Sequence, residues 1–217
     1  SFHPELKRRA IKQLESHGSG STASRLMSGT SPLVSALETK LASIKGTERA
    51  LIFNSGYQTN VSILPAIADR NSFVLMDRAC HASLVTCAVA SRATIKRFAH
   101  NDMDQLRDQL RGLRSRSTGR IVVVTESLFS MDGDLSDLTT ILGLRAEFDT
   151  ILIVDDAHAF GVLGASGSGL ACDPDIDLVV GTFGKACGSF GAFVACSDRL
   201  RAYLINCSSG FVTSTAL

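Results

Sequence analysis

Two stretches near the start of the chain, 4–17 and 31–46, space their apolar positions as helices do, and a loop of small residues lies between them. Residues 4–17 are predicted to form a helix that begins at Pro4 and ends at Gly18, because proline suits a first turn and glycine a helix end. A second helix is expected from its cap at Ser31 to Gly46. The apolar face of the first helix would consist of Leu6, Ala10, Ile11 and Leu14, and that of the second of Leu33, Leu37, Leu41 and Ile44.

From residue 50 onward, short apolar runs alternate with longer amphipathic stretches. Runs that are apolar at nearly every position are typical of strands covered on both faces. Their alternation with helices predicts an α/β fold, a three-layer α/β/α domain over 1–217 with a mostly parallel sheet. The expected strands are 50–53, 73–76, 94–98, 121–125, 151–154, 178–181 and 191–196, and the expected helices are 57–68, 82–91, 102–113 and 135–148.

Three side chains with catalytic chemistry follow two of these strands. Asp155 and His158 come after the strand 151–154, and Lys185 comes shortly after the strand 178–181. Because ligands of α/β folds bind at the carboxyl ends of the strands, the three side chains are expected at one crevice. A carboxylate that protonates a pyridine nitrogen and a lysine that holds an aldehyde are what pyridoxal 5'-phosphate (PLP) requires.

The surroundings of Lys185 leave two interpretations. Its neighbours are small or apolar, which indicates an enclosed amine with a lowered pKa, as Schiff-base chemistry needs. A structural lysine is the other interpretation, and the spacing alone favours neither. A phosphate loop of the G-x-x-x-x-G-K-[ST] type is excluded, because Val179 stands at its first glycine and Ala186 at its hydroxyl position. Asp155 and Asp156 also leave two interpretations, because either could simply cap the turn that follows instead of binding a cofactor.

Two more strand ends carry candidate binding residues. Gly56 and Tyr57 open the helix after the first expected strand, where exposed N–H groups form an anion site unless this is an ordinary turn. The hydroxyl of Thr182 could bind the same anion. His81 follows the strand 73–76 and is either an ordinary helix-start histidine or an imidazole that stacks on a flat cofactor.

Composition narrows the classes of function. The chain has 22 basic and 21 acidic residues and a net charge of +1, which offers no single-sign field for nucleic acid or a membrane surface. Its six cysteines form no C-x-x-C pair, so we expect reduced thiols in a cytoplasmic protein, without a disulfide framework or a metal site. A G-x-G-x-x-A match at 18–23 follows a helix instead of a strand and therefore does not support nicotinamide binding.

Taken together, these motifs resemble those of the α-oxoamine synthases, PLP-dependent enzymes of the aspartate aminotransferase fold, or fold type I. The resemblance covers essentially the whole chain, and the order and spacing of the motifs make it specific. The matching segments are 20–30, 54–57, 81–83, 126–134, 155–158 and 182–185. It implies the large, PLP-binding domain of such an enzyme, with an N-terminal segment and a small C-terminal domain outside these 217 residues.

The resemblance also implies roles for the matching residues. Lys185 would form the Schiff base with PLP, Asp155 would pair with the pyridine nitrogen, and His158 would contact the phenolic oxygen. His81 would stack on the ring. The remaining implied site residues are Gly56, Tyr57 and Thr182 at the cofactor or its phosphate, Glu126 and Ser130 near the site, and Ser214 and Thr215, in a segment that reaches the partner's phosphate in a homodimer.

The activity implied by the resemblance is a decarboxylating acyl transfer. Within the family the chain is most similar to the member of biotin biosynthesis, which joins L-alanine to pimeloyl-CoA or pimeloyl-ACP and forms an amino ketone. Val34 stands where many members carry a histidine, which bears on the identity of the acyl donor. The alternatives are a member that joins glycine or serine to acetyl-, succinyl- or long-chain acyl-CoA, an aminotransferase or lyase of the same fold, and a non-catalytic partner subunit.

Overall fold

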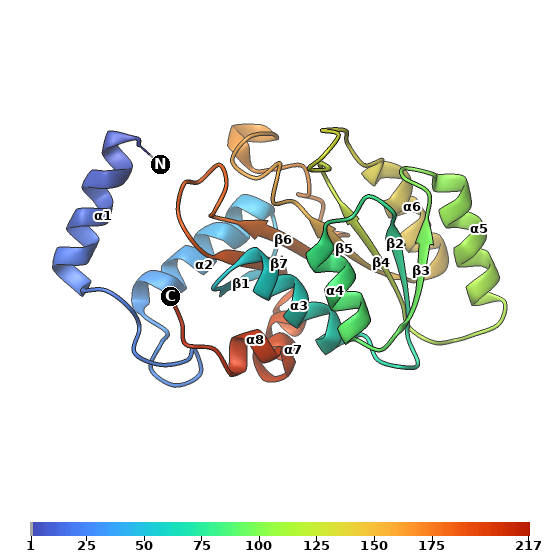
Figure 1. Cartoon of the computed structure of the whole chain (residues 1–217), viewed down its shortest axis with the longest axis horizontal. Coiled ribbons are helices and arrows are strands. Elements are labelled where there is room, and N and C mark those ends of the chain that lie inside the picture. The colour runs from blue at the N-terminus through green and yellow to red at the C-terminus, as the bar shows by residue number, and fades with distance from the viewer. Residues whose placement is uncertain (1) are drawn as a thin grey trace.

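A seven-stranded sheet forms the middle layer of the protein in the computed structural model, which describes residues 2–217 (Figure 1). The strands lie in the order β1-β7-β6-β5-β4-β2-β3. Neighbouring strands are parallel except for β7, which runs antiparallel to β1 and β6. The mostly parallel sheet is therefore confirmed, and residue 1 of the predicted domain lies outside the described residues. The strands are β1 (Arg49–Phe53), β2 (Phe73–Asp77), β3 (Thr94–Phe98), β4 (Ile121–Glu126), β5 (Ile151–Asp155), β6 (Leu178–Thr182) and β7 (Ala192–Cys196).

Helices cover both faces of the sheet, which confirms the three predicted layers (Figure 1). One apolar core lies between the sheet and α2, α5 and α6, and a second lies between the sheet and α3, α4, α7 and α8. The sequence did not predict α7 and α8, because each buries a single side chain and so has a weak apolar pattern. The helices are α1 (Pro4–His17), α2 (Pro32–Lys45), α3 (Gly56–Ile67), α4 (Ala82–Ala90), α5 (Met103–Arg114), α6 (Leu138–Phe148), α7 (Asp198–Cys207) and α8 (Ser209–Val212), with a 3-10 turn at Ala165–Gly167.

The first helix forms where it was predicted, but its apolar face is not buried. α1 ends at Gly18 as expected and buries none of its residues. Leu6 is 39% exposed, and Ile11 and Leu14 are each 57% exposed. Figure 1 shows α1 standing away from the sheet. The predicted stripe is therefore present but remains largely open within residues 2–217.

The buried face of α2 also differs from its predicted apolar stripe. Leu33 and Leu37 are each 41% exposed, whereas Glu38 is buried. Glu38 faces inward because β1 is an edge strand, and its Oε1 accepts a 2.9 Å hydrogen bond from the backbone N–H of Ile52. Arg25 donates both to Glu38, at 2.9 Å, and to the Ile52 carbonyl, at 3.2 Å. This ion pair satisfies backbone groups that an edge strand otherwise leaves unpaired.

The end of β5 sends two adjacent aspartates to opposite faces of the sheet, as successive strand positions do. Asp156 turns toward α2, where it forms a fully buried ion pair with Lys45. The hydroxyl of Ser127 and the backbone N–H of Leu170 donate to the same carboxylate at 2.5 and 3.1 Å. Lys45 also donates to the carbonyl of Ser168 at 2.5 Å. The pair thus fastens α2 to two loops, while the preceding aspartate faces α3.

Candidate active site at the carboxyl ends of the strands

The carboxyl ends of β5 and β6 bring a lysine and a histidine into contact. β5 leads into the turn that carries His158, and β6 leads into the loop that carries Lys185. Nζ of Lys185 lies 2.6 Å from Nε2 of His158. Burial of the ring, together with the charge of the lysine, lowers the pKa of His158. The neutral ring can therefore accept a hydrogen bond from the lysine amine.

Lys185 is more open than the sequence indicated. The predicted enclosure is wrong within residues 2–217, because the residue is exposed and its neighbours Gly184 and Ala186 are too small to cover it. Partial burial nevertheless lowers the pKa of the Lys185 amine, against the opposing charges of Asp155 and Glu126. An amine with a lowered pKa loses its proton more readily and becomes a better nucleophile.

Asp155 is the buried carboxylate of this cluster. Its Oδ2 accepts a 2.9 Å hydrogen bond from Nδ2 of Asn60, and its Oδ1 accepts a 3.0 Å hydrogen bond from the backbone N–H of Ala157. Asp155 is thus the aspartate that caps the following turn. Asn60 lies on α3 and is 2% exposed. Sequence reasoning missed Asn60, although an amide among the apolar positions of the expected helix 57–68 was the available signal.

His81 joins the same network through Ser83. Nδ2 of Asn60 also donates to Oγ of Ser83 at 3.0 Å, and this hydroxyl lies 2.8 Å from Nδ1 of His81. His81 caps the start of α4, where its Nδ1 accepts from the backbone N–H of Ser83 at 3.2 Å. Because Nδ1 is an acceptor, the hydrogen of the neutral ring lies on Nε2. Stacking of this exposed ring on a cofactor stays a prediction.

A second carboxyl group lies beside Asp155. Glu126 ends β4 and is the register partner of Asp155 in β5. Its Oε1 accepts a 2.5 Å hydrogen bond from the backbone N–H of His81. Burial, and after it the charge of Asp155, raises the pKa of Glu126 to about 7. Glu126 is therefore about half protonated at neutral pH, which reduces the negative charge next to Asp155.

Two of the predicted phosphate-binding residues meet at the start of α3. Gly56 opens this helix, and a Cβ at position 56 would lie 3.8 Å from Cβ of Thr182. The Thr182 hydroxyl donates to the Gly191 carbonyl at 3.1 Å and accepts from the backbone N–H of Gly184 at 3.2 Å. Since that hydroxyl is engaged, the N–H groups at the start of α3 are the donors available for an anion.

The other predicted binding residues are held in different ways. Oγ of Ser214 and the carbonyl of Thr215 accept hydrogen bonds from Nδ2 of Asn54, at 3.0 and 2.6 Å. Both residues thus lie beside a strand end of their own chain, and their reach to a partner subunit stays a prediction. Tyr57 is 55% exposed. Ser130 is exposed in the loop between β4 and α6.

A hollow of about 260 Å³ adjoins this corner. Phe183 and Cys187, which flank Lys185 in the chain, contribute to its lining, as do Val34 and Phe190. Most of its lining side chains are apolar. A hydrocarbon chain could therefore lie next to the loop of Lys185 mostly against apolar side chains.

The residues at these strand ends fit a PLP group. The cluster offers a lysine amine with a lowered pKa, a buried carboxylate and a helix start whose backbone N–H groups can face a phosphate. Within residues 2–217, no group of histidine, cysteine or acidic side chains could hold a metal ion. None of the helices described there combines the length and the apolarity needed to cross a bilayer. All six cysteines are free thiols.

The sequence as a whole is similar to known proteins. A family model described as aminotransferase class I and II matches residues 3–217. Among curated proteins, the 8-amino-7-oxononanoate synthase of Geobacter sulfurreducens is 49% identical over 99% of this chain and 56% of its own length. The chain spans about half the length of the curated relatives it matches. These relatives agree with the resemblance seen in the motifs.

Two solved structures have the same fold. A serine palmitoyltransferase variant from S. paucimobilis with bound PLP–myriocin is 30% identical, with a TM-score of 0.93 over 100% of this chain and 55% of its own. The 8-amino-7-oxononanoate synthase of Francisella tularensis is 28% identical, with a TM-score of 0.82 over 100% of this chain and 61% of its own. The predicted fold type is therefore confirmed.

Proposed function

We propose that this chain, which belongs to the class I and II aminotransferase family, forms the large, cofactor-binding domain of a PLP-dependent acyltransferase of the α-oxoamine synthase type. One observation carries the proposal: Lys185 and His158 meet at the strand ends, where Asp155 is buried and linked to His81. The structural lysine of this fold, Lys45, is paired with a buried carboxylate, whereas Lys185 contacts an imidazole at a strand end and has a lowered pKa.

The residues of the site would divide the work as follows. PLP, when bound, would supply an electron sink for the reaction at the α-carbon of an amino acid. Lys185 would hold the cofactor through its amine and, once released by the incoming amino acid, take the α-proton. Asp155 would keep a proton on the pyridine nitrogen. The neutral ring of His158 orients the lysine amine, and His81 would cover the flat face of the cofactor.

The phosphate of PLP would lie at the start of α3. The backbone N–H groups at Gly56 and Tyr57 point out of this helix and favour an anion. Thr182 and Ser130 complete the set of residues that the resemblance assigns to the cofactor. Ser214 and Thr215, which Asn54 holds beside the same corner, would contact the phosphate of a partner subunit.

The proposed substrates are L-alanine and a pimeloyl thioester, of CoA or of acyl carrier protein. Support comes from the curated relatives, at 44–49% identity, which are named 8-amino-7-oxononanoate synthase or "Putative 8-amino-7-oxononanoate synthase". The apolar hollow beside Lys185 is suited to a hydrocarbon chain, and Val34 contributes to its wall. The likeness to serine palmitoyltransferase keeps a second candidate open, in which serine and a longer acyl chain are joined.

The proposed assembly is a homodimer in the cytoplasm. The open apolar side of α1 supports an assembly larger than one chain, because exposed apolar patches are often covered by a partner. Free cysteines are in keeping with a reducing compartment. Molar mass from light scattering would test the dimer, and a monomer at micromolar concentration would contradict it.

The proposed cofactor chemistry is tested by absorption spectroscopy of the protein with PLP, followed by borohydride reduction and peptide mapping. We expect a Schiff-base band and a pyridoxyl adduct on Lys185. A folded protein with neither band nor adduct would refute the enzyme and favour a non-catalytic partner subunit.

The substrates are tested by release of free thiol. L-Alanine, glycine and serine are each offered with pimeloyl-CoA, pimeloyl-ACP, acetyl-CoA, succinyl-CoA and palmitoyl-CoA. The fastest release is expected with L-alanine and a pimeloyl thioester. Turnover of the amino acid without any thiol release would indicate an aminotransferase or a lyase instead.

A further inference from the structure

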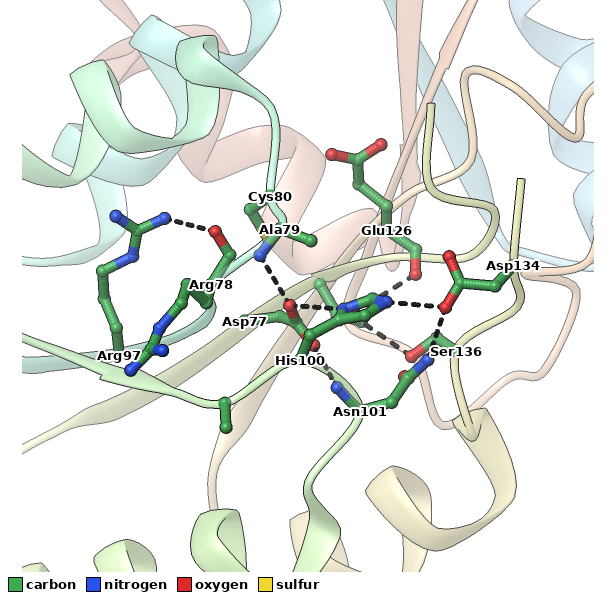
Figure 2. Close-up of polar contacts among 12 residues, drawn as sticks. Asp77, Arg78, Ala79, Cys80, Arg97, His100, Asn101, Glu126, Asp134 and Ser136 are labelled. Carbon is green, nitrogen blue, oxygen red and sulfur yellow. Dashed lines mark hydrogen bonds and ion pairs between the residues drawn. The ribbon is translucent and has the colours of Figure 1, made fainter. Parts of the chain in front are cut away.

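A histidine outside the candidate active site connects two segments that carry site residues. His100 lies in the turn between β3 and α5, and Figure 2 shows it between two aspartates. Its Nδ1 is 2.9 Å from Oδ1 of Asp77, and its Nε2 is 2.6 Å from Oδ2 of Asp134. Asp77 is the buried last residue of β2, and Asp134 lies in the loop between β4 and α6. We refer to these three residues as the histidine clamp.

The clamp requires His100 to carry a proton on both ring nitrogens. Carboxylate oxygens only accept hydrogen bonds, so each nitrogen that faces one has to donate. The Asp77 carboxylate also accepts from the backbone N–H groups of Ala79 and Asn101, at 2.8 and 2.9 Å. Burial of the ring acts to lower the pKa of His100, but the hydrogen bonds and charges of Asp77 and Asp134 outweigh it and raise this pKa.

At its Asp77 end, the clamp sets the turn that leads to His81. The backbone N–H of Ala79 donates to the Asp77 carboxylate, and that of Cys80 donates to the Asp77 carbonyl at 3.2 Å. Residues 78–80 therefore wrap around this aspartate. His81 comes next, and its own N–H is bound by Glu126. The turn that precedes His81 is thus built around a carboxylate that His100 contacts.

At its Asp134 end, the clamp is attached to a loop that is closed on itself. The backbone N–H of Phe129 donates to the Asp134 carbonyl at 3.0 Å, and that of Ser136 donates to the Ser127 carbonyl at 3.2 Å. The buried ring of Phe129 packs edge-on against His100, with 4.4 Å between the ring centroids. Two backbone hydrogen bonds and one aromatic contact therefore make this loop a fixed support.

We infer that His100 is a positioning residue for His81: as an imidazolium it fastens Asp77, and with it the turn 78–80, to the loop that carries Asp134. The contacts of the clamp stand on their own, whereas its effect on turnover rests on the proposed function. The experiment therefore has one arm without cofactor and one arm with it.

The first arm measures the histidine rings of the cofactor-free protein by NMR after ¹⁵N-histidine labelling. It compares the wild type with His100→Gln and with His17→Gln, a matched change of an exposed histidine on α1. Both ring nitrogens of His100 are expected to be protonated at neutral pH, and the His81 signals are expected to shift only in His100→Gln. Asp134→Asn, which opens the other end of the clamp, should shift His81 in the same way if His100→Gln fails to fold.

The second arm measures kcat and KM of the PLP-loaded enzyme. His100→Gln is expected to lower kcat by about tenfold, the size of one lost charge-assisted hydrogen bond, with KM nearly unchanged. In the His81→Ala variant, the additional change His100→Gln should lower kcat no further, because His100 acts through His81.

Three results would overturn the inference: a neutral His100 ring, His81 signals that do not move, or the full loss of kcat on the His81→Ala background. The last of these would assign His100 a general structural role, because independent effects add. A wild type that forms no Schiff base would refute the proposed function instead, and the first arm would still decide the clamp.

Discussion

Two lysines lie near the end of β5, one on the side of Asp156 and one on the side of Asp155, and their surroundings differ. Lys45 is fully buried against Asp156, on the side of α2. Lys185 is exposed and rests against the neutral ring of His158, at the strand end where Asp155 is buried. Lys45 is engaged by a buried carboxylate and serves the fold, whereas the lowered pKa of Lys185, at an open strand end, lets its amine react.

The difference follows from the alternation of side chains along a strand. Asp155 and Asp156 are adjacent, and so they point to opposite faces of the sheet. Asp156 meets the interior, where Lys45, Ser127 and Leu170 satisfy its carboxylate. Asp155 meets the network of α3 and α4 instead. One strand end therefore serves the fold on one face and the candidate chemistry on the other.

Replacement of Lys185 is expected to have the largest effect on turnover. Lys185→Ala is expected to lower kcat by at least about ten-thousandfold, because the group that holds the cofactor and takes the proton is lost. The free energy of unfolding should hardly change, since the residue is exposed. Steady-state thiol release and urea unfolding measure the two quantities, with Lys40→Ala on the exposed side of α2 as the control. Retained turnover would remove Lys185 from the site.

The opposite result is expected for the interior lysine. Lys45→Met should lower the free energy of unfolding by about 3–5 kcal/mol, because it leaves the buried Asp156 carboxylate without its counter-ion. The double variant Lys45→Met/Asp156→Asn should regain part of that loss, since asparagine carries no charge. Urea unfolding measures both variants. A single variant as stable as the wild type would show that the pair does not hold α2.

The sequence could supply the order of the seven strands and of helices α1 to α6, and the strand-end positions of Asp155, His158 and Lys185, because these depend on local periodicity. It could not supply partners that lie far apart in the chain. Lys45 meets Asp156 across 111 positions, and Asn60 meets Asp155 across 95. The inward orientation of Glu38 was likewise not predictable, because it depends on β1 being at the edge of the sheet.

Asp155→Asn removes the charge of the site-side aspartate and keeps the shape of its side chain. Asp155→Asn is expected to leave PLP bound to Lys185 and to lower kcat by roughly a hundred- to a thousandfold, as a neutral amide cannot keep a proton on the pyridine nitrogen. Asp156→Asn is the matched control next to it and should affect stability more than kcat. The borohydride adduct and steady-state rates measure the effect. Full activity of Asp155→Asn would refute the electron-sink role.

The pH dependence of stability tests whether Glu126 and Asp155, two neighbouring carboxyl groups on the site side, disfavour each other's ionisation. Burial and Asp155 raise the pKa of Glu126 from 4.5 to about 7, so folding takes up a proton between these two values. Below pH 4.5 the raised pKa of Glu126 contributes fully to the free energy of unfolding. This contribution, about 3 kcal/mol or less, is lost as the pH rises to about 7.

Glu126→Gln should remove this loss, because glutamine is neutral and its amide oxygen still accepts from the N–H of His81. Urea unfolding at several pH values, with the exposed Glu15→Gln as control, measures the difference between the profiles. The wild type and Glu126→Gln should diverge only above pH 4.5, and the variant should be the more stable at pH 8. Parallel profiles would mean that Glu126 ionises freely beside Asp155, so that the strand end would carry two negative charges instead of one.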